Sequence, residues 1–115
     1  LKGIVASILH VKPIISMNDA DGRYKNVGQA MTENKMAQRM VELVTARFGS
    51  QKLRMQCMHG DNLPGVETLR KAIRQSLDCV EQDLVAVTTV LGAHAGPTVI
   101  GLAAMPETLF ASLTA

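Results

Sequence analysis

The longest apolar stretch of the chain lies between Leu84 and Met105, where a loop of small residues separates two hydrophobic runs. The first run, Leu84 to Val90, is interrupted only by Thr88 and Thr89, and further apolar residues follow the loop. Short apolar runs bounded by turn residues are typical of strands that are buried on both faces. We therefore predict a buried strand over Leu84 to Val90, a loop, and a second buried strand near Val99 to Met105.

Two upstream segments have the periodicity of amphipathic helices. Thr32 precedes the first segment and is a suitable N-cap, and Gly49 ends it. The second segment has Asp61 or Asn62 as its cap and Pro64 in its first turn. Apolar residues recur in the two segments at steps of three and four: Met36, Met40, Leu43, Val44 and Phe48, then Val66, Leu69, Ile73 and Leu77. These stripes predict two helices that each cover a core with one face.

Alternation of apolar and polar residues predicts a strand over Lys52 to Met58. Its buried face would consist of Leu53, Met55 and Cys57. Nearer the N-terminus, Pro13 to Met17 form another predicted strand, and the turn-forming residues Asn18 to Gly22 lead back into Arg23 to Ala30. This second pattern predicts an antiparallel hairpin.

Both ends of the chain have helical patterns. Apolar residues between Leu1 and Leu9 recur with helical spacing, and Glu107 to Ala115 follow Pro106 as a short helix or a frayed end. Because the chain has no initiator Met and starts within a predicted element, we expect it to be the later part of a longer protein. At 115 residues it fits one domain. The mixture of elements predicts an α+β fold, with a mixed sheet of about five strands flanked by helices.

Composition narrows the functional classes. The chain is 47% hydrophobic but only 3% aromatic, so its core must consist of aliphatic side chains and Met. The net charge is +2 and the basic residues are scattered, which argues against nucleic acid as a partner. No apolar run reaches the roughly twenty residues that a transmembrane helix needs. Cys57 and Cys79 lack the spacing of a disulfide framework or a metal site, so we expect two buried thiols and a cytoplasmic location.

Two polar clusters have simple structural explanations. Asp19 and Asp21 alternate as in a calcium loop, but the further acidic ligands that such a loop needs are absent from the sequence. His59 is close to Asp61, yet neighbours at this spacing rarely form a catalytic dyad, and a turn with a helix cap accounts for both. We therefore assign no metal, cofactor or acid–base chemistry to either cluster.

The loop from Gly92 to Thr98 is the strongest candidate for a functional site. Glycine and alanine leave its peptide N–H groups accessible, and His94 adds an imidazole at close range. His94 could donate to a carboxylate or phosphate, act as a general base or nucleophile, or hold the loop by binding backbone carbonyls. The nearest acidic residues, Asp83 and Glu107, lie outside the loop, so catalysis has the least support.

The segment LGAHAGPTVIGLA resembles the loop near the C-terminus of the DegV family, whose members bind fatty acids and include the binding subunits of bacterial fatty acid kinase. The chain departs from the family pattern at Thr98, where the last glycine usually stands, and matches it at Gly92, His94, Gly96 and Pro97. The segment ILHVKPIISMNDADG is similar to a second family block, a helix end followed by a Lys-Pro-Ile-Leu strand and its turn. The two blocks occur in the family order and correspond to the C-terminal part of a member.

The resemblance implies binding of a long-chain fatty acid without turnover. The carboxylate would lie against the loop, and the acyl chain would occupy a tunnel shared with an N-terminal domain that is absent from this chain. The implied ligand-binding residues are His94, Ala95, Gly96, Pro97 and Thr98. The resemblance implies no catalytic residue and no cofactor, and it implies the same fold class as the pattern of elements does.

Whether a fatty acid kinase is an expected partner depends on the residue at position 31. In kinase-coupled members a Val-Arg-Thr pattern usually precedes the helix that Thr32 caps here, and this chain has Met31 in place of the arginine. If that arginine engages the fatty acid kinase, Met31 argues against this partner. The alternative function is a protein-interaction or dimerisation module in which the His94 loop is structural.

Overall fold

Strand β3 (Leu53–His59) is the central strand of the fold, in agreement with its alternating sequence. The computed structural model describes residues 12–17, 24–87, 96 and 98–114. Leu53, Met55 and Cys57 are at most 4% exposed, and the residues between them are half-buried. Because successive side chains of a strand point to opposite faces, one face of β3 packs in the core.

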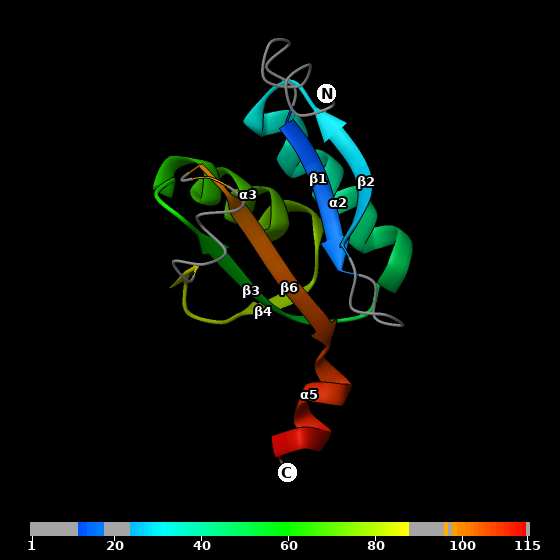
Figure 1. The fold of residues 1–115 in the computed structure, drawn as a ribbon. Helices are drawn as coiled ribbons and strands as arrows, with labels where there is room; N and C mark the ends of the chain where they lie inside the picture. The colour runs from blue at the N-terminus through cyan, green and yellow to red at the C-terminus, as the bar shows by residue number, and fades with distance from the viewer. Residues whose placement is uncertain (1–11, 18–23, 88–95, 97, 115) are drawn as a thin grey trace.

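The main sheet is mixed and has four strands within the described residues. Two short strands, β4 (Cys79–Glu81) and β5 (Val85–Ala86), run parallel to β3, and β6 (Ile100–Pro106) runs antiparallel along its full length. β4 pairs with the first half of β3, and β5 pairs with its last two residues. β4 and β5 therefore share one edge of β3, and β6 occupies the other edge (Figure 1).

The first two strands form a separate antiparallel hairpin. β1 (Lys12–Met17) pairs with β2 (Tyr24–Ala30), and the register shifts between Ile14 and Ile15. Ile14 is 6% exposed, whereas Ile15 is 53% exposed. The predicted hairpin is confirmed, and the turn that was compared with a calcium loop lies outside the described residues.

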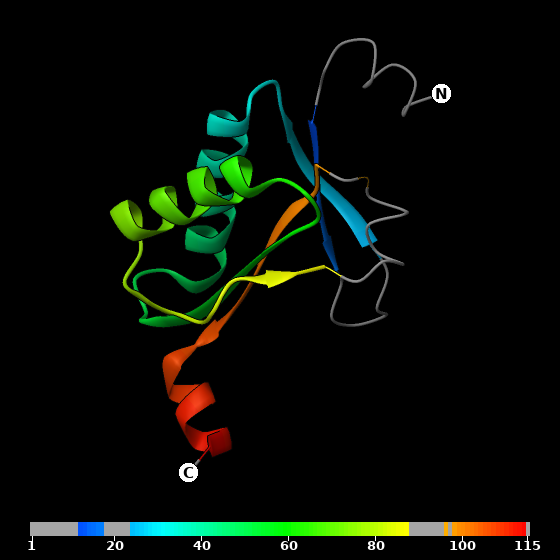
Figure 2. The ribbon, with the colours of Figure 1, turned by 90° about the vertical axis from the view of Figure 1, so that its left-hand side faces the viewer.

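Two amphipathic helices cover the same face of the main sheet (Figure 2). α2 (Glu33–Phe48) begins after its N-cap Thr32 and ends at Gly49, where a positive φ of 66° favours glycine. α3 (Leu63–Ser76) begins after its N-cap Asn62, with a proline in its first turn. Both helices and both caps agree with the sequence prediction. The buried face of α2 differs from the predicted stripe: Ala37 and Val41 are buried, whereas Met40, Leu43 and Phe48 are only half-buried.

Side chains from the two helices and from β3 form one hydrophobic core. Its buried members are Ala37, Val41 and Val44 of α2, Leu53, Met55 and Cys57 of β3, and Val66, Leu69 and Ile73 of α3. Met40 and Phe48 of α2 pack against this cluster. Each fully buried aliphatic side chain contributes about 1.5–3 kcal/mol relative to an exposed one, so this cluster is a main source of stability.

A partly buried ion pair attaches the C-terminal helix α5 (Glu107–Thr114) to the sheet. Arg54 of β3 donates two hydrogen bonds to the Glu107 carboxylate, at 2.8 and 2.6 Å. The Arg54 guanidinium also lies 4.2 Å from the centre of the Phe110 ring. Bidentate, partly desolvated pairs are stronger than ordinary surface pairs. The start of α5 is therefore fixed, while its body extends away from the sheet (Figure 1).

Two expectations about the sheet are wrong. The sequence pattern predicts no strand at Cys79–Glu81, because three residues are too few to show a period. The apolar runs on either side of the loop predict strands buried on both faces, but both residues of β5 are exposed, Val85 by 39%, and β6 is half-buried apart from its exposed Ala103. Residues 88–90 of the first predicted strand lie outside the described residues. β5 pairs only with the end of β3 and, within the described residues, has no strand on its other side. The predicted first helix lies outside the described residues.

Truncation of Leu69 tests the proposed core. Leu69 of α3 is 0% exposed, so Leu69→Ala removes packed atoms and leaves a cavity. We expect the free energy of unfolding to fall by about 2–5 kcal/mol, as measured by urea denaturation. Gln75→Ala, on the exposed side of the same helix, should change it by less than about 0.5 kcal/mol. Equal losses in the two variants would contradict this description of the core.

Candidate functional site

The loop between β5 and β6 is anchored at both ends to the carboxyl end of β3. The Val87 N–H donates to the His59 carbonyl at 2.9 Å, and the Gly60 N–H donates to the Val99 carbonyl at 3.0 Å. β5 runs parallel to β3 and β6 runs antiparallel to it, so the chain leaves the sheet and re-enters it at the same end. The carboxyl ends of parallel strands are a frequent place for ligand sites in open sheets.

The structure describes two of the five predicted ligand-binding residues. Gly96 has a φ of 89°, in the left-handed region that favours glycine, and its carbonyl accepts a backbone hydrogen bond of 3.3 Å within the turn. Thr98 is exposed. The other three, His94, Ala95 and Pro97, lie outside the described residues.

Asn62 connects this loop with the beginnings of both helices. Its side-chain oxygen accepts a hydrogen bond from the Gly65 N–H at 3.0 Å, which is the bond of an N-cap. Its side-chain nitrogen donates to the Thr98 carbonyl at 2.8 Å and to a Glu33 carboxylate oxygen at 3.3 Å. The sequence predicts the cap but not the two donations, because the acceptors are 36 and 29 residues away.

Gly65 provides the space for this cluster. A Cβ atom at Gly65 would collide with the side chains of Asn62 and Glu33. Glycine costs stability within a helix, so its presence in the first turn of α3 calls for a packing reason, and this collision supplies one. A glycine directly after Pro64 is the sequence signal that could have indicated close packing here.

His59 belongs to the turn that precedes α3. Its Nδ1 accepts a hydrogen bond from the backbone N–H of Asn62 at 3.2 Å. Asp61 is exposed in the bend between them. The interpretation of this segment as a turn with a helix cap is confirmed.

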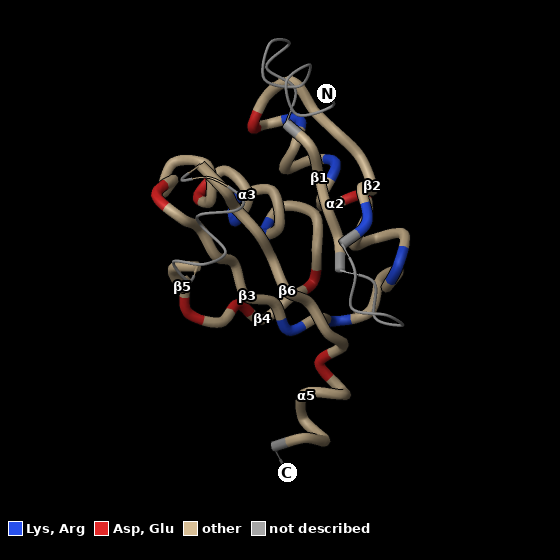
Figure 3. The backbone as a smooth tube through the Cα atoms, in the orientation of Figure 1, with Lys and Arg blue, Asp and Glu red and all other residues tan. Residues whose placement is uncertain are grey.

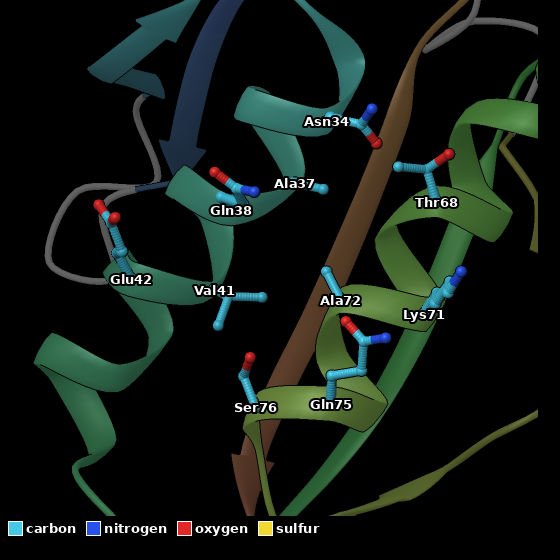
Figure 4. A pocket seen from close by; sticks show the side chains of 10 residues that line it. All are labelled: Asn34, Ala37, Gln38, Val41, Glu42, Thr68, Lys71, Ala72, Gln75 and Ser76. Atoms are coloured by element: carbon cyan, nitrogen blue, oxygen red, sulfur yellow. The ribbon is translucent and has the colours of Figure 1, made fainter.

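A groove of about 580 Å³ lies between α2 and α3 (Figure 4). Its lining comes from both helices: Asn34, Ala37, Gln38, Val41 and Glu42 of α2, and Thr68, Lys71, Ala72, Gln75 and Ser76 of α3. None of these residues belongs to β3 or to the loop between β5 and β6. The groove is therefore separate from the candidate site.

Basic and acidic residues are interspersed along the described part of the chain (Figure 3). Among these residues, no three His, Cys, Asp or Glu side chains are grouped so that they could hold a metal ion. In the same part of the chain, no helix is both long and apolar enough to cross a bilayer. The hydrogen bonds described above identify the polar groups of the candidate site: the loop backbone and the side chains of Asn62 and Glu33.

The two cysteines are free. Cys57 is buried in the core as expected, whereas Cys79 packs against the core and is only half-buried. Burial, with a smaller contribution from the nearby Glu81 carboxylate, raises the pKa of the Cys57 thiol from 9.0 to about 11. Burial is also the main reason why the pKa of Cys79 is raised. Because the thiolate is the nucleophilic form, both cysteines are poorly reactive at neutral pH.

Residues 1–107 match the sequence profile of the DegV family, which is described as a family of uncharacterised proteins. The chain belongs to the DegV family. A DegV domain-containing protein of Staphylococcus aureus is 26% identical over 107 residues, which are 92% of this chain and 38% of that protein. A DegV domain-containing protein of Halalkalibacterium halodurans is 30% identical over 86% of this chain and 35% of its own length. The chain thus spans less than two fifths of these relatives.

Solved DegV proteins share this fold. A DegV lipid binding protein from Thermotoga maritima has a TM-score of 0.78 and 21% identity, over 85% of this chain and 34% of that chain. The fatty acid binding DegV family protein SAG1342 from Streptococcus agalactiae has a TM-score of 0.71 and 20% identity, over 91% and 37%. The predicted α+β class is therefore confirmed for this DegV chain.

The raised pKa of Cys57 predicts a loss of stability at high pH. The unfolded chain releases the thiol proton near pH 9, whereas the folded chain keeps it until about pH 11. The free energy of unfolding therefore keeps its full value below pH 9 and falls between pH 9 and 11. The total loss is up to about 3 kcal/mol, because each pKa unit corresponds to about 1.4 kcal/mol. Urea denaturation at several pH values measures this loss. Cys57→Ala should show a smaller loss over the same range, and equal slopes in both proteins would contradict the assignment.

Proposed function

We propose that this DegV domain binds a long-chain fatty acid without converting it. The anchored loop carries the proposal: both of its ends are hydrogen-bonded to the carboxyl end of β3. Donors on an anchored backbone need little reorganisation when a carboxylate binds. Membership of the DegV family adds support, as do two solved proteins of the same fold that are described as lipid binding and fatty acid binding.

The carboxylate binds at residues 94–98 in this proposal. The His94 imidazole and the peptide N–H groups of Ala95, Gly96 and Thr98 are the donors, and each charge-assisted bond contributes about 1.5–3 kcal/mol. Pro97 has no N–H and restricts the backbone between two donors. The left-handed φ of Gly96 supports this arrangement, because a residue without a side chain lets the ligand approach the main chain closely.

The acyl chain lies along the face of the main sheet that points away from α2 and α3. Met58 of β3 and Gly101, Ala103 and Met105 of β6 share that face through their register, and each is exposed or half-buried. Arg54 and Gln56 of β3 lie on the same face, and Arg54 is paired with Glu107. The small residues leave space for an acyl chain on the sheet, and the flexible Met side chains can adapt to the shape of that acyl chain. Each buried methylene contributes about 0.8 kcal/mol, so a sixteen-carbon chain contributes about 12 kcal/mol before the costs of binding.

An N-terminal domain completes the tunnel in this proposal. The chain spans 38% and 35% of the two relatives, which leaves room in such proteins for a further domain. Among the described helices, α2 and α3 cover the opposite face of the sheet (Figure 2). The domain described here supplies one wall and part of the head-group contacts, so on its own it binds lipid weakly.

The protein acts in the cytoplasm as a binding protein in this proposal. The free thiols of Cys57 and Cys79 are compatible with a reducing compartment. Met31 is 59% exposed directly before α2, where a partner could reach it. A thioether lacks the charge and the donors by which arginine binds carboxylate or phosphate, which weakens the case for a fatty acid kinase as partner.

A protein-interaction or dimerisation module is the second candidate function. Leu109 and Leu113 of α5 are 50% and 69% exposed, on a helix that extends away from the sheet (Figure 1). Exposed apolar side chains that lie together favour contact with another protein. In this alternative, the loop that contains His94 only shapes the edge of the sheet.

Titration of the delipidated intact protein with a fluorescent long-chain fatty acid tests the first proposal. We expect saturable binding, and we expect His94→Ala to weaken it by about 10- to 150-fold through the loss of one charge-assisted hydrogen bond. His94→Gln keeps a neutral N–H donor, so its affinity should lie between those of the unmodified protein and His94→Ala. Native mass spectrometry should detect lipid in the protein as purified.

Melting temperatures of the same variants separate the two candidate functions. If no lipid binds and His94→Ala changes only the melting temperature, the loop is structural and fatty acid binding is wrong. Light scattering would then test the interaction module, because a dimer formed through α5 should dissociate in Leu113→Glu.

A further inference from the structure

We propose that Asn62 is a positioning residue for the ligand loop. Its side-chain amide holds the loop at the Thr98 carbonyl and links it to the first turn of α2 through Glu33. This inference rests on the proposed function, in which the loop binds a carboxylate. It assigns to Asn62 a role beyond capping α3.

The amide nitrogen is the reason why capping alone does not explain this residue. An N-cap needs only an oxygen acceptor, and Ser, Thr or Asp supplies one as well as Asn does. Asn62 uses its oxygen for the Gly65 N–H and its nitrogen for two distant acceptors, Thr98 and Glu33. Of the good N-cap residues, only asparagine has an acceptor and two donors in one side chain.

Gly65 and Glu33 hold the Asn62 amide in position. The missing side chain of Gly65 leaves the space that the Asn62 amide and the Glu33 carboxylate occupy. Glu33 is the first residue of α2 and lies beside the first turn of α3, where the helix dipoles favour a negative charge. The carboxylate is therefore a stable acceptor that orients the amide.

The contact with Thr98 acts directly on the proposed ligand loop. Gly96 and Val99 are joined by a backbone hydrogen bond, and Val99 is joined to Gly60 by a second one. Asn62 adds the side-chain bond to the Thr98 carbonyl, so three hydrogen bonds hold the exit of the loop. Loss of the Asn62 donations should release the backbone donors around Gly96 and weaken ligand binding while the helix cap stays intact.

Asn62→Ser separates positioning from capping. Serine keeps an oxygen for the Gly65 N–H but cannot reach the Thr98 carbonyl, so both donations are lost. In the titration described above, we expect the affinity for the fatty acid to fall by about five- to tenfold. Amide hydrogen exchange at Gly60 and Val99 should be faster, and the melting temperature should change little.

Asn34→Ser is the matched control. Asn34 follows Glu33 in α2, is exposed in the groove between the helices (Figure 4), and is remote in sequence from the loop. The same substitution at Asn34 should change neither the affinity for the fatty acid nor the amide hydrogen exchange at Val99. If Asn62→Ser lowers the melting temperature but leaves both quantities unchanged, Asn62 is only a cap and the inference is overturned.

If the proposed function is wrong, the experiments give a different result from the one expected if only the role of Asn62 is wrong. In that case the unmodified protein binds no fatty acid, and hydrogen exchange alone decides the role of Asn62. Faster exchange at Val99 in Asn62→Ser, but not in Asn34→Ser, would still support positioning of the loop. Unchanged exchange would overturn the inference independently of any ligand.

Discussion

Burial of one face of β3 is the constraint on which the rest of this DegV domain depends. Leu53, Met55 and Cys57 can leave water only if apolar side chains from elsewhere cover them, and the stripes of α2 and α3 do so. Both helices must therefore lie on the same side of the sheet (Figure 2). Since α3 follows β3 after a short turn, its first residues lie at the carboxyl end of that strand.

The candidate site results from the same arrangement. His59 at the end of β3 and Gly60 directly after it provide the backbone groups that anchor both ends of the loop. The residue that starts α3, Asn62, also contacts the loop and the first turn of α2. One short segment between a strand and a helix thus joins the buried core to the loop that we propose binds a carboxylate.

Much of the fold could be predicted because its signals are local. The Thr32 and Gly49 caps act on backbone groups within the same helix turn, and the alternation in β3 reflects burial of every second residue. β4 could not be predicted, since three residues gain strand geometry only by pairing with β3. The expected double burial is not seen at Val85 and Ala86 of β5, because an apolar sequence does not reveal that, within the described residues, its strand pairs on one side only.

The sequence by itself determined the α+β class, the limits of α2, the approximate start of α3, the inner face of β3, and the loop with His94 as the candidate for ligand chemistry. These depend on neighbouring residues and on periodicity. Only the tertiary structure decided that Thr98, Asn62 and Glu33 form one hydrogen-bonded cluster, and that Gly65 must be small beside it. The physical reason is distance along the chain: these contacts join residues that only packing of the helices on β3 brings together.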